Sequence, residues 1–146
     1  MAGEPGALAH CATAEVGVPA ATAYAFMADG LKQRHWALGS LDRREVGDGL
    51  FAGHSLFDGK ELFVRLIGDP DLLLVDYHLG PAPNRLRRLV EARIVRGTTL
   101  GLGDERSVVT LTHWRGEGVS DEEWNLTYHL WQTEVQLIRG ALERGL

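Results

Sequence analysis

The stretch that decides the fold is SDEEWNLTYHLWQTEVQLIRGAL, residues 120–142. Ser120, with Glu123 three positions later, forms a capping box, which predicts that a helix begins here. The helical pattern can run for about 25 residues, on the order of 37 Å at 1.5 Å per residue. A helix of that length crosses a whole small domain, so the rest of the chain must be arranged around it.

The apolar residues of this helix fall into two bands on a helical wheel. The first band follows the line of Trp124 and contains Tyr128, Trp131, Val135, Ile138 and Leu142. The second contains Leu126, Leu130, Leu137 and Ala141. Together they give an apolar face about 200° wide, which predicts a sheet that curls around the helix.

The N-terminal part of the chain predicts one strand followed by two short helices. Residues 9–18 alternate between small apolar and polar side chains, the period of a strand with one covered face. Pro19 then suits the first turn of a helix over residues 20–28. Asp29-Gly30 ends that helix, and residues 31–36 indicate a second short one.

The middle of the chain reads as strands separated by turn residues. The predicted strands are residues 41–46, 50–57, 61–67, 72–79, 86–95 and 107–114. Asp58-Gly59 fits a type I′ hairpin turn, in which both central residues need a positive φ. Because no helical pattern interrupts these segments, we expect sequential antiparallel pairing. The fold class is therefore α+β, with about seven strands around the long C-terminal helix.

Bulk properties limit the range of functions. A chain of 146 residues fits a single domain, 1–146, in which residues 1–8 form a loose tail. A net charge of −5 argues against a nucleic-acid partner. No apolar stretch of these residues is long enough to span a bilayer, and the Ala/Gly/Pro-rich start lacks the pattern of a signal peptide, so we expect none. Cys11 is the only cysteine, so no internal disulfide forms and we expect a cytoplasmic protein.

This order of elements resembles the helix-grip fold of the START/Bet v 1-like superfamily, also called SRPBCC, which includes polyketide cyclase-like proteins. The resemblance rests on residues 16–27 (VGVPAATAYAFM), on residues 34–36 (RHW) and on the closing helix from Glu123 to Glu143. It covers nearly the whole chain. It implies a cavity between sheet and helix for lipids, polyketides or aromatic compounds, and it transfers no catalytic residues.

Glu134 is the first candidate for chemistry. It lies inside the apolar arc of the closing helix, with Thr127 on the same side. A carboxyl group buried there would have a raised pKa and could exchange protons near neutral pH. The alternative is an ion pair with a strand arginine, or an edge position that reaches water.

Other candidates come from the strands. Arg88 shares a strand face with Val90, and Arg65 shares one with Phe63, so either arginine could clamp a ligand if that face is internal. His113 follows Val109 and Leu111 on one face and is a candidate partner for Glu134. His54 is the second candidate pocket histidine. The alternative for His113 and His54 is a structural role as hydrogen-bonded residues of the pocket wall.

Aromatic and apolar side chains complete the predicted ligand site: Trp131, Tyr128, Tyr77 and Ile138. Filling the core is the alternative for each of them. The six histidines lack zinc-site spacing, and no nucleophile elbow, Walker loop or dinucleotide fingerprint occurs. We therefore expect neither a metal nor a cofactor.

Three functions remain open. The first is binding of a hydrophobic or aromatic small molecule in a cavity of a few hundred Å³. The second is a cyclase, dehydratase or hydrolase that uses Glu134 and His113 in the same cavity. The third is an interaction module similar to chaperone activators, which needs no cavity. A homodimer is compatible with each of them.

Overall fold

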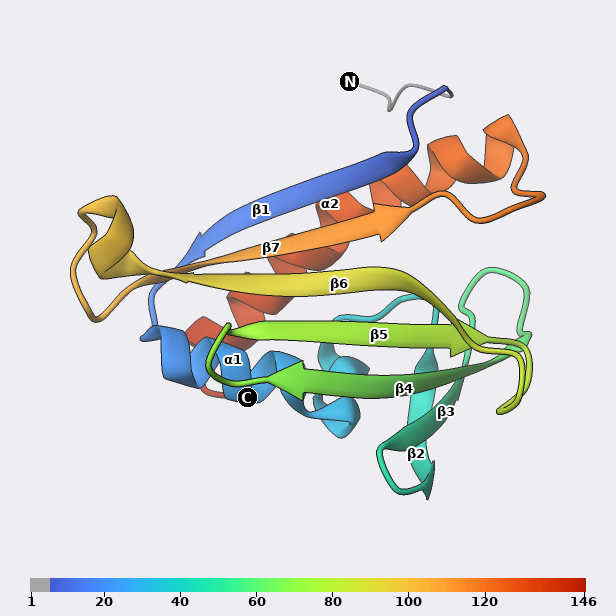
Figure 1. Cartoon of the computed structure of the whole chain (residues 1–146), viewed down its shortest axis with the longest axis horizontal. Helices are drawn as coiled ribbons and strands as arrows, with labels where there is room; N and C mark the ends of the chain where they lie inside the picture. The colour runs from blue at the N-terminus through green and yellow to red at the C-terminus, as the bar shows by residue number, and fades with distance from the viewer. Residues whose placement is uncertain (1–5) are drawn as a thin grey trace.

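A computed structural model describes residues 6–146, so most of the predicted tail, residues 1–5, lies outside the described residues. A seven-stranded antiparallel sheet curves around the C-terminal helix (Figure 1). The strand order is β1-β7-β6-β5-β4-β3-β2. The strands are β1 (Ala9–Val16), β2 (Leu41–Gly47), β3 (Leu50–His54), β4 (Glu61–Asp69), β5 (Leu74–Gly80), β6 (Arg87–Arg96) and β7 (Ser107–Trp114). The predicted α+β helix-grip fold is confirmed.

The two predicted short helices follow β1. Helix α1 (Ala20–Ala28) begins after Pro19, whose φ of −61° suits a helix entry and whose carbonyl accepts a hydrogen bond from Ala23 N at 3.1 Å. The second element, η1 (Gly30–His35), is a 3-10 helix. Another 3-10 helix, η2 (Gly97–Leu100), was not predicted and lies between β6 and β7.

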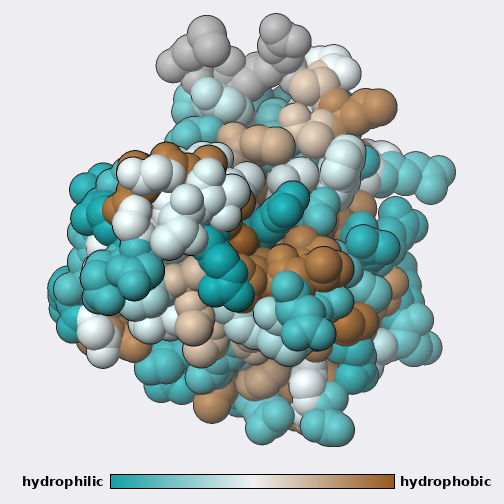
Figure 2. Space-filling model, turned by 60° about the vertical axis from the view of Figure 1, so that its left-hand side comes forward, coloured by the Kyte–Doolittle hydropathy of each residue, from teal (hydrophilic) through white to brown (hydrophobic). Residues whose placement is uncertain are grey.

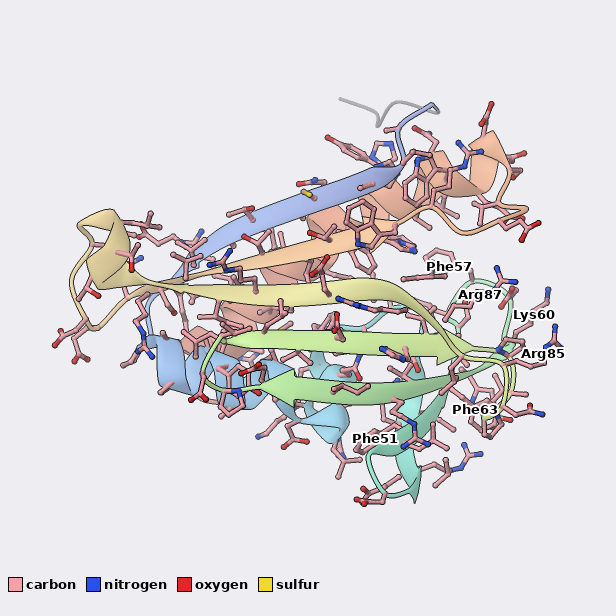
Figure 3. The ribbon with its side chains drawn as sticks, viewed as in Figure 1. Phe51, Phe57, Lys60, Phe63, Arg85 and Arg87 are labelled. Carbon is pink, nitrogen blue, oxygen red and sulfur yellow. The ribbon has the colours of Figure 1, made fainter. Side chains whose placement is uncertain are left out.

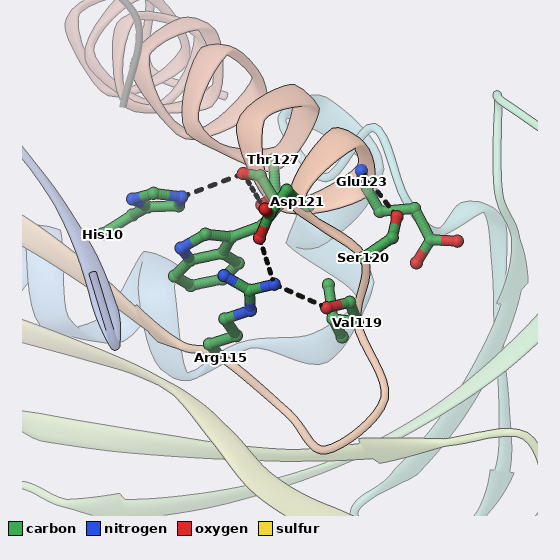
Figure 4. Close-up of polar contacts among 8 residues, drawn as sticks. His10, Arg115, Val119, Ser120, Asp121, Glu123 and Thr127 are labelled. Carbon is green, nitrogen blue, oxygen red and sulfur yellow. Dashed lines mark hydrogen bonds and ion pairs between the residues drawn. The ribbon is translucent and has the colours of Figure 1, made fainter. Parts of the chain in front are cut away.

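Helix α2 (Asp121–Glu143) begins where the capping box predicts it. Ser120 Oγ accepts a hydrogen bond from Glu123 N at 3.1 Å, and Arg115 Nη2 donates to Asp121 Oδ1 at 2.8 Å (Figure 4). Arg115 Nη2 also donates to the carbonyl of Val119. These bonds fix the first turn of α2 to the chain that leaves β7.

Three hydrogen bonds hold α2 along β1. His10 Nε2 donates to Trp124 O at 2.9 Å, near the start of both elements. Gln132 Nε2 donates to Cys11 O at 3.3 Å, and Gly17 N donates to Glu143 Oε2 at 2.9 Å near both ends. The helix and the strand therefore run in the same direction, as Figure 1 shows. The inner face of β1 carries Ala12, Ala14 and Val16, mostly small side chains that let the helix pack closely.

The predicted breadth of the apolar arc on α2 was wrong. Leu126 is 46% exposed and Leu137 is 38% exposed, so much of the second band faces solvent. Trp124, Trp131 and Val135, from the first band, are buried. Which residues of each band are buried depends on how the helix packs on β1, and a helical wheel carries no information on that packing. The space-filling view shows a group of apolar residues near the centre of this face of the molecule, with hydrophilic residues around it (Figure 2).

The predicted type I′ turn at Asp58-Gly59 was also wrong. Gly59 has a φ of +71°, but Asp58 is not among the residues with positive φ. The connection is longer than two residues, because Gly59 N donates to Ser55 O at 2.9 Å and Ser55 N donates to Lys60 O at 2.9 Å. Strand β3 accordingly ends at His54 rather than at Phe57.

Candidate functional site

A cavity of about 160 Å³ lies between α2, the inner face of the sheet and the chain that follows η1. It is smaller than the few hundred Å³ predicted. Its volume is close to that of an engineered protein cavity that accommodates benzene. The site therefore has room for about one aromatic ring with small substituents.

The walls are mainly aromatic and aliphatic. Trp36 comes from the segment after η1, Tyr77 from β5 and Trp131 from α2, and Val64 and Val90 complete the sheet side. The Tyr77 hydroxyl donates to Met27 O at 2.5 Å, and burial raises the pKa of this phenol far above its usual range. Tyr77 is thus a neutral, fixed wall residue.

Glu134 lines the cavity and is 4% exposed. Its Oε1 accepts a hydrogen bond from Leu38 N at 3.0 Å. Burial raises the pKa of the carboxyl group from 4.5 to about 8, against the smaller lowering effect of the Leu38 bond. No ion pair of Glu134 occurs within residues 6–146, so the predicted alternative of a strand-arginine partner is not found. At neutral pH the group is largely an undissociated acid.

His113 lines the cavity from β7. Its ring lies 4.7 Å from that of Trp131 and 5.3 Å from that of Trp124, measured between ring centroids. Burial, assisted by His10, lowers the pKa of His113 to about 4, so the ring is neutral at pH 7. Its Nδ1 atom is buried and has no hydrogen-bond partner among the described residues.

The remaining predicted residues of α2 divide between the cavity and the core. Thr127 lines the cavity, and its Oγ1 donates to Trp124 O at 2.7 Å. Ile138 is fully buried in the hydrophobic core and does not line the cavity. Tyr128 is also absent from the lining, and its ring meets that of His10 edge-on at 5.4 Å. The ligand-binding predictions for Ile138 and Tyr128 were therefore wrong for this cavity.

Arg88 lies on the outer face of the sheet, contrary to prediction. The β5–β6 register passes from Tyr77 opposite Val90 directly to His78 opposite Arg88, which leaves one extra residue in β6. Such a β-bulge reverses the side-chain alternation beyond it. The Arg88 Nε atom therefore meets Asp76 Oδ1 at 3.2 Å in an ion pair on the outer face.

Arg65 and His54 also lie away from the cavity, so both predictions were wrong. Arg65 Nη1 donates to Asp48 O at 3.0 Å, and the neighbouring inward residue of β4 is Val64. His54 is exposed at the end of β3. At the same end of the sheet, Lys60, Arg85 and Arg87 extend into solvent (Figure 3).

The sequence reading missed a buried polar cluster beside the cavity. Gln33 and Ser40 line the cavity, and Arg43 lies behind them with 7% exposure. Arg43 Nη1 donates to Ser40 Oγ at 2.5 Å, and Nη2 donates to Gln33 Oε1. No local signal in the sequence marks Arg43 as the buried residue, because the bulge at Asp42 that turns it inward depends on how β2 pairs with β3.

Two findings concern the described residues as a whole. Within residues 6–146 no three His, Cys, Asp or Glu side chains gather in a group that could hold a metal ion. In the same range no helix combines the length and the apolar character needed to cross a membrane.

Comparison with known proteins identifies similar folds. No protein-family model matches the sequence, and no curated protein matches it. A START superfamily protein from Mycobacterium smegmatis superposes with a TM-score of 0.70 at 11% identity, over 96% of this chain and 100% of that one. The Zhui aromatase/cyclase from Streptomyces sp. R1128 gives 0.66 at 18% identity, over 93% of each chain. The Aha1 dimer from Colwellia psychrerythraea gives 0.68 at 13% identity, over 95% of this chain and 98% of that one.

These proteins have different names and roles but share one architecture with this chain. At such identities the likeness concerns the arrangement of strands and helices, not the chemistry of the site. The protein therefore has the same helix-grip fold as these START superfamily, aromatase/cyclase and Aha1 structures.

Proposed function

We propose that this protein binds a compact hydrophobic or aromatic molecule in the cavity between α2 and the sheet. The observation that carries the proposal is the cavity of about 160 Å³ walled by Trp36, Tyr77 and Trp131. Flat aromatic walls favour a ring, which they contact by stacking or edge-to-face packing. The small volume favours a one-ring ligand over a lipid chain.

The test is calorimetric titration of the protein with one-ring aromatic compounds such as α-methylstyrene. We expect saturable binding, and we expect Trp131→Ala to weaken it by about threefold to tenfold, the range of an aromatic pair. Trp114→Ala is the matched control, because Trp114 is 46% exposed and donates from Nε1 to Glu91 on the outer face. Unchanged affinity in a Trp131→Ala, Glu134→Gln double variant would contradict the site.

A second candidate is acid–base catalysis in the same cavity. The observation that favours it is the buried carboxyl group of Glu134 in the cavity lining, whose pKa burial raises to about 8, so that it can donate a proton at neutral pH. His113, with its pKa near 4, is a weak base and suits hydrogen bonding better than proton abstraction. A cyclase, dehydratase or hydrolase would then depend on Glu134 as acid. Glu134→Gln would abolish its pH-dependent rate, and unchanged turnover would exclude this role.

The cavity also bears on the third candidate, an interaction module that acts through its surface. Such a module needs no internal space, and a fully packed interior would favour it. The cavity of about 160 Å³ instead supports ligand binding.

A further inference from the structure

Two polar side chains at the cavity are both oriented as hydrogen-bond donors. Hydrogen-bonding walls normally mix donors and acceptors, because the backbone and most polar side chains supply both. At this cavity, Gln33 and Ser40 are each left with a hydrogen to donate. Arg43, which lies one layer behind the cavity wall, is the cause.

The backbone aims Arg43 inward. The β2–β3 pairing slips between Leu41 and Arg44, and Asp42 there has a φ of +53°. A bulge of this kind redirects a side chain, and aspartate is among the few non-glycine residues that enter the left-handed region readily. Arg43 is consequently buried, whereas Asp42 and Arg44 on either side are exposed.

Two glycines allow the surrounding segments to approach closely. A Cβ on Gly53 would lie 2.6 Å from Leu41 O and 2.5 Å from Ser40 Oγ. A Cβ on Gly30 would overlap the ring of Phe51, which lies 5.7 Å from the Arg43 guanidinium carbon. Residues without a Cβ are therefore required at both positions for Ser40 and Phe51 to lie where they do.

The bonds of Arg43 fix the orientation of its neighbours. A guanidinium group has only donors, so Gln33 must present its carbonyl oxygen to Arg43. The amide nitrogen of Gln33 is then left for the cavity. Ser40 Oγ accepts from Arg43 Nη1 at 2.5 Å, so its own hydrogen is likewise left to donate elsewhere. Arg43 Nε donates to Gly30 O at 3.3 Å.

The cationic charge of Arg43 is not neutralised by a carboxylate. Within residues 6–146 no Asp or Glu forms an ion pair with it. Burial lowers the pKa of Arg43 to about 10, which leaves the group charged at neutral pH. Positive charge behind Gln33 and Ser40 makes their hydrogens more attractive to a negative partner.

The other polar groups of the lining are of both kinds. Thr127 Oγ1 donates its hydrogen to Trp124 O, and the neutral ring of His113 has one nitrogen that can accept. Glu134 accepts from Leu38 N through Oε1, and as an undissociated acid it offers its O–H as a further donor. A ligand that satisfies the hydrogens of Gln33, Ser40 and Glu134 must bring acceptors.

We propose that Arg43 is a positioning residue that locks Gln33 and Ser40 as hydrogen-bond donors, so that the cavity selects a one-ring aromatic molecule bearing a carbonyl oxygen. This inference rests on the proposed function, since it specifies which compound the same cavity prefers. It predicts that amines and other hydrogen-bond donors of the same size bind more weakly. It also predicts discrimination between compounds of one shape.

The experiment compares three probes by calorimetric titration. Acetophenone carries the carbonyl, α-methylstyrene replaces its oxygen with CH₂ at the same shape, and N-methylaniline carries an N–H donor and is uncharged at pH 7. We expect acetophenone to bind about threefold to tenfold more tightly than α-methylstyrene, the effect of one or two net hydrogen bonds. N-methylaniline should bind most weakly.

Two variants of Gln33 test the orientation. In Gln33→Glu, one carboxylate oxygen keeps the bond to Arg43 while the other turns an acceptor toward the cavity. We expect this variant to lose the acetophenone preference and to gain affinity for N-methylaniline. Gln33→Leu should lose the preference without that gain. Thermal melts establish that each variant is folded.

Arg43→Lys tests the positioning role separately. A single ammonium cannot hold Gln33 and Ser40 together as the guanidinium fork does, so the amide is free to turn over. We expect the ratio of acetophenone to α-methylstyrene affinity to fall toward one, an effect that a purely structural role would not produce. If Arg43→Lys does not fold, the two Gln33 variants still test whether the Gln33 amide is held as a donor.

The outcomes separate the two proposals. Equal binding of acetophenone and α-methylstyrene to the unmodified protein would overturn the donor-selectivity inference and leave the cavity as a binding site. Binding of none of the three probes would overturn the proposed function and the inference with it. An unaltered preference in Gln33→Glu would also overturn the inference.

Discussion

The two sides of α2 lie against the same sheet in different surroundings. Toward β1 the helix is held by three hydrogen bonds, from His10, Gln132 and Gly17, over small inward alanines. Toward β4–β7 it leaves a cavity lined by Glu134 and His113. The difference shows that one helix can be fixed by one edge of a sheet while its other side stays available for a ligand. Stability and binding should therefore respond to different substitutions.

The largest expected effect is the pH dependence that the cavity side imposes. The folded-state pKa of Glu134 lies above its unfolded value, so the folded chain keeps a proton that the unfolded chain releases between pH 4.5 and about 8. The free energy of unfolding therefore falls as pH rises through this window, by on the order of 5 kcal/mol at most.

His113 acts in the opposite direction. Its folded-state pKa is lowered to about 4, so the unfolded chain takes up a proton that the folded chain refuses, and stability is lost as pH falls from 6.5 to 4. The two effects oppose each other between pH 4.5 and 6.5. Above 6.5 only the loss due to Glu134 remains.

Urea unfolding at pH 5, 6.5 and 8 measures this balance. We expect Glu134→Gln to remove the loss of stability between pH 6.5 and 8 that the unmodified protein shows. Curves that run parallel in the two proteins at all three pH values would mean that Glu134 is not a buried acid.

The second effect concerns the side of α2 toward β1. Trp124 is almost fully buried, and its ring stacks on His10 with centroids 3.7 Å apart. We expect Trp124→Ala to lower the free energy of unfolding by about 3–5 kcal/mol, as for other large core truncations. Trp131→Ala removes the same side chain from the cavity wall, where fewer neighbours fill the space. Chemical denaturation should show a clearly smaller loss for Trp131→Ala, and equal losses would contradict the comparison.

The third effect is a change in the free energy of unfolding that has opposite signs in the two regions. Val64 lines the cavity, whereas Val135, on α2, lies in the hydrophobic core and does not line the cavity. Val64→Leu adds a methylene to open space, so we expect a gain of about 0.5–1 kcal/mol in stability together with weaker ligand binding. Val135→Leu adds the same group to a filled interior and should cost about 1–3 kcal/mol. Destabilisation of similar size by both substitutions in thermal melts would show that the cavity is not available.

The smallest effect tests a single bond on the closed side. Gln132→Ala removes the hydrogen bond to Cys11 O, for an expected loss of about 0.5–1 kcal/mol. Gln136→Ala is the matched control, because Gln136 is an exposed glutamine one turn farther along α2. If Gln136→Ala lowers the free energy of unfolding as much as Gln132→Ala does, the loss comes from a change in helix propensity and not from the hydrogen bond to Cys11 O.

The amino-acid sequence by itself determined the elements and their order. Local patterns sufficed because the capping residues Ser120 and Glu123, Pro19 and the alternation of β1 act over a few neighbouring residues. The position of Glu134 inside the apolar arc also followed from helical periodicity, since the period of a helix is fixed by its geometry.

Only the tertiary structure decided which strand residues face inward. One extra residue in β6 turned Arg88 outward, and a left-handed Asp42 turned Arg43 inward, so the buried arginine was not the predicted one. A bulge depends on the pairing between strands, which has no local signal in the chain. The size of the cavity likewise depends on how closely α2 approaches each strand, a property of the packed whole rather than of any segment.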